Sequence, residues 1–188
     1  MTETELIHRL QSGDEPAFRS LVQEHQHRVY NTVLGFLQDP SDAEEATQDV
    51  FIKVHQHVGT FKGESSLTTW IYRIAVTTSL DALRKRKRKG QARFLVSLFG
   101  RENETAVLPD FYHPGVAAEQ KEDSAFLFRA IRTLPDNQQA AFLLQKLEGL
   151  SQPEIAEVLK TSVSAVESLL HRAKAGLRKT LHEKYSNR

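Results

Sequence analysis

Apolar side chains recur at intervals of three and four residues along most of the chain, which is the spacing of one face of an α-helix. In the first long segment, Asp14 is expected to cap the helix, with Pro16 in its first turn. The apolar stripe that follows consists of Phe18, Leu21, Val22, His25, Val29, Val33 and Leu37. This pattern predicts an amphipathic helix that ends near the sequence "DPSDAEE" (39–45).

Two further helices are expected in the first half of the chain. Ser41 and Glu44 have the spacing of a capping box and predict the start of a second helix. The apolar face of this helix would be Ala46, Val50, Phe51, Val54 and Val58. The sequence "GTFKGESS" (59–66) indicates a loop, and Ser66 is expected to open a third helix. Its core stripe would be Leu67, Trp70, Ile71, Ile74 and Ala75.

The helical pattern fails from Gly90 to about Asp123 and resumes near Ser124. The interval has scattered acids, glycines and prolines, and one apolar piece, "FLVSLFG" (94–100), with no evident packing partner. Four helices are expected after it, and no strand-like alternation is present. We therefore predict an all-α protein of two small helical domains joined by a flexible linker. The domains are placed at residues 1–92 and 124–188, and the linker at residues 93–123.

The end of the chain has the pattern of a helix-turn-helix. Ser151 can cap a short helix that contains Pro153 and turns Ile155, Ala156 and Leu159 inward. A break at residues 160–162 precedes a second helix with the expected buried stripe Val163, Val166, Leu170, Ala173 and Leu177. The opposite face of the second helix is polar and basic, with small residues at its N-terminus. This distribution suits entry into a major groove, although a plain helical hairpin remains the alternative.

Composition removes several classes of function. The 188 residues contain no cysteine, which excludes disulfides, thiolate zinc sites and thiol catalysis. No apolar run is long enough to span a bilayer and the N-terminus lacks a signal-peptide core, so a cytoplasmic protein is expected. The pairs His25/His27 and His55/His57 are two residues apart, which on a helix turns the rings away from each other. We expect no metal, no cofactor and no enzymatic activity.

Charge is arranged in blocks. The formal net charge is only +1, yet the segments 1–60, 61–100, 101–140 and 141–188 have formal net charges of −6, +7, −3 and +3. The strongest block contains the uninterrupted basic run Arg84–Lys89. Such alternation indicates at least two surfaces for polyanions, separated by surfaces for other partners. A solvated charge run is the simpler alternative for residues 84–89.

Two long stretches resemble a known family. "LPDNQQAAFLLQKLEGLSQPEIAEVLKTSVSAVESLLHRAKAGLRK" is similar to the −35-binding domain of bacterial RNA polymerase sigma factors of the extracytoplasmic-function (ECF) group. "DPSDAEEATQDVFIKVHQHVGTFKGESSLTTWIYRIAVTTSLDALRKRKR" is similar to the −10-binding domain of that group. The resemblance implies a sigma factor that binds core RNA polymerase, recognises both promoter elements and promotes melting. A stand-alone dimeric helix-turn-helix regulator is the alternative.

The resemblance implies that the polar loop captures a flipped −10 base, while the following helix contacts the element. Aromatic and basic side chains suit this role, because bases stack on aromatic rings and phosphates attract cations. The alternative for Phe61 and Trp70 is that they belong to the hydrophobic core and do not contact DNA. The residues expected at the −10 element are Phe61, Lys62, Ser65, Ser66, Thr69, Trp70, Tyr72, Arg73, Thr77, Arg84, Lys85 and Arg86.

In the C-terminal domain the resemblance implies a −35 interface on the second helix of the helix-turn-helix. Its expected residues are Ser151, Ser162, Ser164, Ala165, Ser168, His171, Arg172 and Lys174. Glu167 and Leu169 depart from the family, in which these positions are often basic. Ser164 and Glu167 could form a capping box, or Glu167 could accept a hydrogen bond from cytosine.

The acidic helix after Ser41 implies a protein partner. By the resemblance, its polar face binds core RNA polymerase, through the β′ clamp helices and with the β subunit as a further partner. The residues expected there are Asp42, Glu45, Gln48, Asp49 and Lys53. A solvated acidic face is the alternative. The resemblance also implies an anti-sigma protein, promoter DNA as the other partner, and a free protein that is monomeric and does not insert into the membrane.

Overall fold

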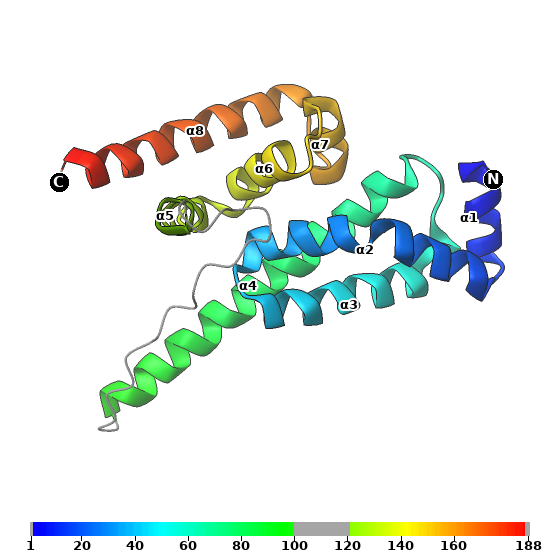
Figure 1. Ribbon diagram of the computed structural model, residues 1–188, viewed down its shortest axis with the longest axis horizontal. Helices are drawn as coiled ribbons and strands as arrows, with labels where there is room; N and C mark the ends of the chain where they lie inside the picture. Colours follow the sequence, from blue (N-terminus) through cyan, green and yellow to red (C-terminus); the bar gives the residue numbers. More distant parts are fainter. Residues whose placement is uncertain (1, 100–120, 187–188) are drawn as a thin grey trace.

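The computed structural model describes residues 2–99 and 121–186, and the side chains of residues 2–88 and 125–182. Every regular element in this part of the chain is helical, which confirms the all-α prediction (Figure 1). The N-terminal domain contains α1 (Glu3–Gln11), α2 (Glu15–Leu37), α3 (Pro40–His57), the short 3-10 helix η1 (Val58–Thr60) and α4 (Leu67–Phe99). The C-terminal domain contains α5 (Lys121–Arg132), α6 (Asp136–Leu147), α7 (Gln152–Leu159) and α8 (Val163–Ser186).

Helices α2, α3 and α4 pack against one another and enclose the core of the N-terminal domain. Its centre is aliphatic, with Leu21, Val33, Val50, Val54 and Ile71 at most 1% exposed. These residues belong to the stripes expected from the sequence. Burial of each such side chain stabilises the fold by about 1.5–3 kcal/mol.

Helix α1 was not expected from the sequence. Thr2 and Glu5 form a capping box that starts it, and its residue Leu10 is buried. Two long-range hydrogen bonds fix α1 to the loop before α4. The Gln11 amide donates to the Phe61 carbonyl oxygen at 2.9 Å, and Glu3 accepts from the Leu67 backbone N–H at 2.6 Å. The Thr-x-x-Glu spacing at residues 2–5 was the available signal for this helix.

In the N-terminal domain, the helix starts follow two of the three expected caps. Asp14 accepts from the Ala17 N–H at 3.0 Å and caps α2. Ser66 accepts from the Thr69 N–H at 3.1 Å before α4. The box at Ser41 and Glu44 was wrong: Asp39 caps α3 instead, accepting from the Asp42 N–H at 3.0 Å. Pro40 at the first helical position, with its fixed φ, explains the earlier start.

Helix α4 continues to Phe99, beyond Gly90 where the sequence pattern was expected to fail. The side chains of the apolar segment 94–100 lie outside the described residues, and so do residues 100–120 of the linker expected at residues 93–123. In the C-terminal domain the three expected helix breaks are present. Val163 was wrongly placed in the buried stripe of α8: it is the first residue of that helix and 40% exposed.

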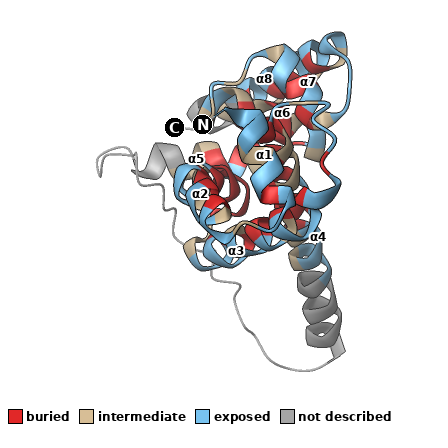
Figure 2. Cartoon of the chain, turned by 90° about the vertical axis from the view of Figure 1, so that its right-hand side faces the viewer, coloured by how far each residue is buried: buried red, intermediate tan, exposed pale blue. Residues whose placement is uncertain are grey.

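The two domains pack against each other. Contacts join α2 to α6 and α4 to α7, and buried residues lie on the inward faces of both domains (Figures 1 and 2). Gly35 of α2 allows the close approach, since a Cβ atom there would lie 2.5 Å from the Leu147 Cδ1 atom. A search of the described helices finds none with the length and apolar character needed to cross a membrane.

Candidate nucleic-acid interface

The loop after η1 places a polar surface next to a partly accessible aromatic pair. Phe61 is 8% exposed, and its ring lies 5.1 Å from that of the half-buried Trp70. Phe61 therefore lies in the core, which was the alternative considered for it. Lys62 and Ser66 are exposed and Ser65 is half-buried, so the loop itself offers polar groups around the edge of Trp70.

Two residues of α4 that were expected at the −10 element are buried. Thr69 is 7% exposed and its hydroxyl accepts from Ser66 at 2.9 Å. Tyr72 is 2% exposed and donates to a Glu148 carboxylate oxygen at 2.5 Å. Burial, followed by this hydrogen bond, raises the pKa of Tyr72. The expected exposure of Thr69 was wrong, since its hydroxyl is taken up by Ser66 of the preceding loop. Tyr72, which was expected close to this loop, is covered by the C-terminal domain.

Glu148 is the polar centre of the domain contact, and the sequence pattern did not single it out. Its side chain is only 4% exposed. Besides Tyr72, it accepts from the Thr32 hydroxyl at 2.7 Å, and the Arg28 Nε atom lies 3.4 Å away. The Arg28 guanidinium also lies 5.7 Å from the centre of the Tyr72 ring. One carboxylate of the C-terminal domain thus connects α2 with α4.

Basic residues of α4 make further contacts with the C-terminal domain. Arg73 donates to the Glu157 carbonyl oxygen at 2.7 Å. Arg84 donates to Asp136 at 2.9 Å and also pairs with Asp81 of its own helix. These contacts occupy part of the surface expected to face the −10 element. Thr77 and Lys85 remain exposed, and Arg86 is half-buried with Asp42 at 3.4 Å.

The structure brings residues expected at the two promoter elements into one hollow. This hollow, of about 720 Å³, lies between the loop before α4 and the α7–α8 turn. Ser65 and Arg73 line one side of it, and Ser162 and Lys160 line the other. Of its lining residues, Ser65 and Arg73 were expected at the −10 element and Ser162 at the −35 element.

The expected −35 surface is largely exposed on α7 and α8. Ser151 bonds to Glu154 through its backbone N–H at 2.7 Å, and the Ser162 hydroxyl accepts from the Ala165 N–H at 3.2 Å. Ser162 therefore caps α8, and the alternative capping box at Ser164 and Glu167 was wrong. Ala165 is half-buried, and the remaining members of the set are exposed: Ser164, Ser168, His171, Arg172 and Lys174.

The acidic face of α3 is open at its centre. Glu45, Gln48 and Asp49 are exposed. Asp42 faces Arg86, and the Lys53 ammonium donates to the Thr78 hydroxyl at 2.9 Å. Lys53 and Asp42 are thus bonded within the domain, in contrast to the exposed Glu45, Gln48 and Asp49.

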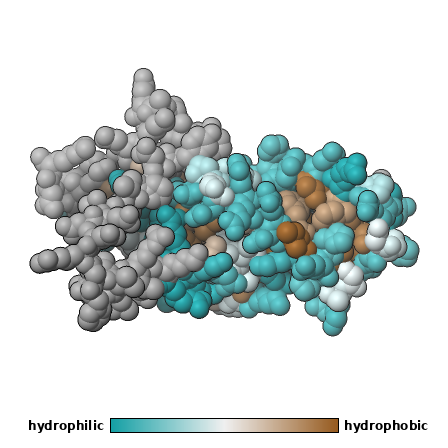
Figure 3. Space-filling view, turned by 90° about the horizontal axis from the view of Figure 1, so that it is seen from below, coloured by the Kyte–Doolittle hydropathy of each residue, from teal (hydrophilic) through white to brown (hydrophobic). Residues whose placement is uncertain are grey.

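An apolar groove of about 570 Å³ adjoins Gln48 between α2 and α3. Phe18, Val22, Phe51 and Ile52 line it, and Ile52 is 53% exposed. Figure 3 shows apolar side chains gathered on this underside of the molecule among hydrophilic ones. An acidic and amide-bearing rim beside an exposed apolar groove suits a protein partner.

No group of three or more histidine, aspartate or glutamate side chains positioned for a metal is found among the described residues. His55, one of the paired histidines, packs its ring 4.9 Å from that of Phe18.

Comparison with known proteins gives two family matches in chain order. Residues 21–89 match the family described as Sigma-70 region 2, and residues 127–177 match Sigma-70, region 4. The RNA polymerase sigma-H factor of Pseudomonas aeruginosa is 33% identical over 181 residues, covering 95% of this chain and 93% of the relative. The ECF RNA polymerase sigma-E factor of Escherichia coli K12 is 32% identical over 179 residues, covering 94% of this chain and 93% of the relative.

Solved structures share the fold over most of the chain. CnrH in complex with the cytosolic domain of CnrY matches with a TM-score of 0.68 and 24% identity, covering 95% of this chain and 96% of that one. The sigma factor RpoE in complex with the anti-sigma factor NepR from Bartonella quintana matches with a TM-score of 0.63 and 20% identity. That match covers 87% of this chain and 96% of RpoE.

Proposed function

The chain belongs to the ECF group of the sigma-70 family of RNA polymerase sigma factors, and from this premise we propose which surfaces perform its three contacts. The observation behind the premise is the ordered pair of family matches, together with 33% identity across 95% of the chain. A sigma factor acts as a dissociable polymerase subunit. We propose that this one binds core polymerase through α3, the −10 element through the loop before α4 and α4 itself, and the −35 element through α8.

The −35 contact is assigned to the exposed face of α8. Ser164 and Ser168 lie near the N-terminus of this helix, where a helix inserted in the major groove contacts base edges. Arg172 and Lys174 follow one turn further along, at positions suited to phosphates. This arrangement predicts that the first turns of α8 set base preference and that the basic residues supply affinity independent of sequence.

The −10 contact is assigned to Lys62, Ser65, Ser66 and the exposed edge of Trp70, with the basic residues of α4 on the backbone. Stacking of a base on an aromatic ring contributes about 1–3 kcal/mol, which offsets part of the cost of unstacking. Thr69 and Phe61 would support this loop from beneath, because both are buried. Tyr72, Arg73 and Arg84 would reach DNA only after the C-terminal domain moves away.

Promoter binding therefore requires a domain opening. Arg73 and Arg84 bond to Glu157 and Asp136, and the hollow between the domains joins the two DNA surfaces. We propose that the arrangement described here is a closed form of the free monomer. Core polymerase would stabilise an open form by binding the two domains at separate places.

The remaining partners follow from the family. RpoE is seen with an anti-sigma factor, and we propose that an anti-sigma protein also restrains this chain. The α2–α3 groove and the acidic face of α3 are the surface that such a protein would share with polymerase. We propose that the protein works in the cytoplasm, where promoter DNA is, and has no catalytic activity of its own.

Co-elution with core polymerase tests the proposed function. The variant carrying Gln48→Ala and Asp49→Lys should lose co-elution on gel filtration while keeping its helical circular dichroism spectrum. The matched control carries Gln23→Ala and Glu24→Lys on α2, which makes the same charge change at other exposed positions. Normal co-elution of the α3 variant would place the docking surface elsewhere. Binding of the free wild type to a palindromic duplex as a dimer would favour the regulator alternative.

A further inference from the structure

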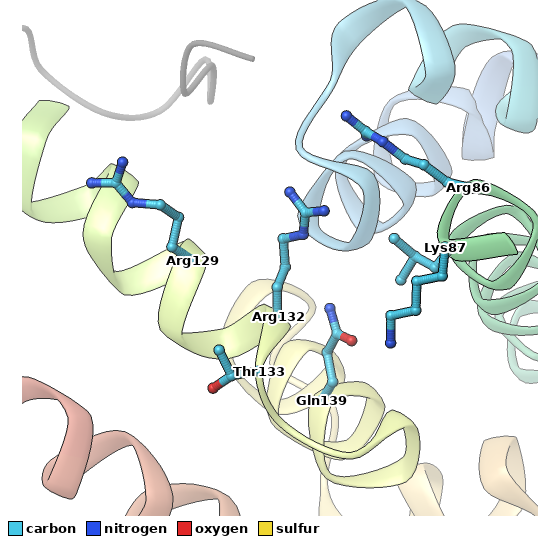
Figure 4. Close-up of a pocket in the computed structure, with 7 residues that line it drawn as sticks. Arg86, Lys87, Arg129, Arg132, Thr133 and Gln139 are labelled. Carbon is cyan, nitrogen blue, oxygen red and sulfur yellow. The ribbon is translucent and has the colours of Figure 1, made fainter. Parts of the chain in front are cut away.

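A basic pocket lies where the second half of α4 faces the C-terminal domain. It has a volume of about 370 Å³ and is lined by Leu83, Arg86 and Lys87 of α4, Arg129 and Arg132 of α5, and Thr133 and Gln139. Figure 4 shows Arg86 and Lys87 on one side, Arg132 opposite them, and Gln139 at the base. The volume is in the range of small-molecule sites.

The positive charge of this pocket is poorly compensated. Among residues whose side chains are described, Arg129, Arg132 and Lys87 have no carboxylate within ion-pair distance, and Arg86 has only Asp42 at 3.4 Å. Burial, and then the nearby charge of Arg86, lowers the pKa of Arg132. Grouping like charges in a half-buried site destabilises the protein unless an anion is present.

A second observation points to a ligand. Gln139 is 2% exposed, and its Nε2 atom has no hydrogen-bond partner although it lines the pocket. Figure 4 shows its amide directed into the space between Arg132 and Lys87. A buried amide without a partner costs free energy, and such groups are rare in folded proteins. The Thr133 hydroxyl is not available as a further donor to a ligand, because it donates to the Ala130 carbonyl oxygen at 2.8 Å.

The polar groups free to act in the pocket are donors: guanidinium, ammonium and amide N–H. A complementary ligand must consist of acceptors, be strongly anionic and be compact enough for the volume. Arginine forks match phosphate oxygens in pairs, and lysine adds a point charge. We propose that this pocket binds a small polyphosphate, such as the phosphate chain of a nucleotide.

Because the pocket lies between the two domains, a bound ligand would affect how the domains are arranged. Its cations come from α4 on one side and from α5 on the other, so the site is complete only while the domains are closed. A ligand that binds one form of a two-state protein stabilises that form by its differential affinity. Since Arg86 also belongs to the expected −10 contact, bound polyphosphate would compete with promoter DNA. This regulation goes beyond the proposed function but rests on its closed form and on the −10 role of Arg86; binding in the pocket itself does not depend on where polymerase docks.

Calorimetric titration of the full-length protein with sodium tripolyphosphate tests the proposal. One-to-one binding tighter than about 1 mM at fixed ionic strength is expected. Arg132→Gln and Arg129→Gln should each weaken binding about tenfold, the loss expected for one charge-assisted hydrogen bond. The Arg129 side chain is exposed, so its replacement keeps the fold intact even if Arg132→Gln does not. Arg178→Gln, which removes an exposed charge from α8, is the matched control and should bind normally.

Two further titrations distinguish the sources of the phosphate. A nucleoside triphosphate with the affinity of tripolyphosphate would show that the phosphate chain alone is recognised, and tighter binding would add a base or sugar contact; both support the site. Absence of saturable binding, or equal losses in Arg129→Gln and Arg178→Gln, would overturn it. A single-stranded oligonucleotide that binds more tightly and shows the same variant profile would also overturn it, in favour of a nucleic-acid surface.

Discussion

At the scale of single residues, His25 is expected to make the stability of the N-terminal domain depend on pH. It belongs to the apolar stripe of α2 and is 9% exposed. Burial is the main cause that lowers its pKa; the nearby Glu24 acts in the opposite direction and Arg28 in the same one. The folded state therefore holds the imidazole neutral at pH values where the unfolded chain protonates it.

The sign of the resulting pH dependence follows from this difference. Below the unfolded pKa of about 6.5, the unfolded state binds more protons than the folded state, so the free energy of unfolding falls as the pH falls. The slope from one residue is at most about 1.4 kcal/mol per pH unit. Denaturant unfolding between pH 7 and pH 5 measures it, and His25→Leu should reduce the slope. An unchanged slope would contradict the role of His25.

Ser168 tests the assignment of base preference on α8. Its side chain is exposed near the helix N-terminus, and Arg172 donates to its carbonyl oxygen at 3.2 Å. Ser168→Arg should shift the preferred −35 sequence toward guanine in a randomised-promoter selection, because arginine pairs with the O6 and N7 acceptors of guanine. Lys174→Ala, the comparison, should weaken binding to all sequences alike. An unchanged preference in Ser168→Arg would place this position outside the groove.

At the scale of elements, local signals predicted the helices well and failed where two signals overlapped. Asp14 and Ser66 cap α2 and α4 as expected, and each directly precedes the first residue of its helix. At the start of α3, both Asp39 and Ser41 could occupy the N-cap position. The Asp39-Pro40 pair determines the start, although the Ser41 and Glu44 spacing favoured a later one. The apolar stretch of α1 is too short to show a clear helical period, so the sequence pattern did not predict this helix. The error at α3 concerns which of several adjacent residues begins the helix, whereas α1 is a short helix that was not expected.

The α7–α8 turn contains a backbone conformation that glycine would adopt more readily. Lys160 has φ 52 and ψ 50, in the left-handed region, and its side chain is exposed. This conformation costs a residue with a Cβ atom about 1–2 kcal/mol. Lys160→Gly should therefore raise the free energy of unfolding of the protein by about 1 kcal/mol. Lys174→Gly, in the middle of α8, should lower it by about 1 kcal/mol, because glycine weakens helix interiors. Destabilisation by both changes would contradict the argument.

At the scale of the whole molecule, the sequence predicted two DNA-binding surfaces but not their mutual closure. The stripes of α2, α3 and α8 account for much of the cores because burial follows periodicity. The contact between the domains instead depends on a few pairs far apart in the chain, such as Tyr72 with Glu148 and Arg84 with Asp136. Such pairs leave no periodic signal. Tyr72 and Arg84, which were expected to contact DNA, thus contact the other domain in the closed form. Under the proposed opening, they would be free to contact DNA.

Gly35→Lys tests the closed form. A Cβ atom at Gly35 would already lie 2.5 Å from the Leu147 Cδ1 atom, so we expect the longer side chain to push α6 away from α2. Lysine is compatible with the interior of α2. The chain has no cysteine, so spin labels can be attached at Gln56→Cys and Arg178→Cys alone. We expect the distances between the labels to lengthen and broaden in electron spin resonance.

The matched control for this experiment is Gly59→Lys, since no atom lies within 4 Å of a Cβ atom built at Gly59. This variant should keep the distances of the otherwise unchanged labelled protein. The Gly35→Lys variant should also bind a single-stranded −10 oligonucleotide more tightly, because opening uncovers Tyr72, Arg73 and Arg84. Longer distances without tighter binding would show that closure does not mask the −10 surface. Unchanged distances would show that the domains accommodate the lysine without opening.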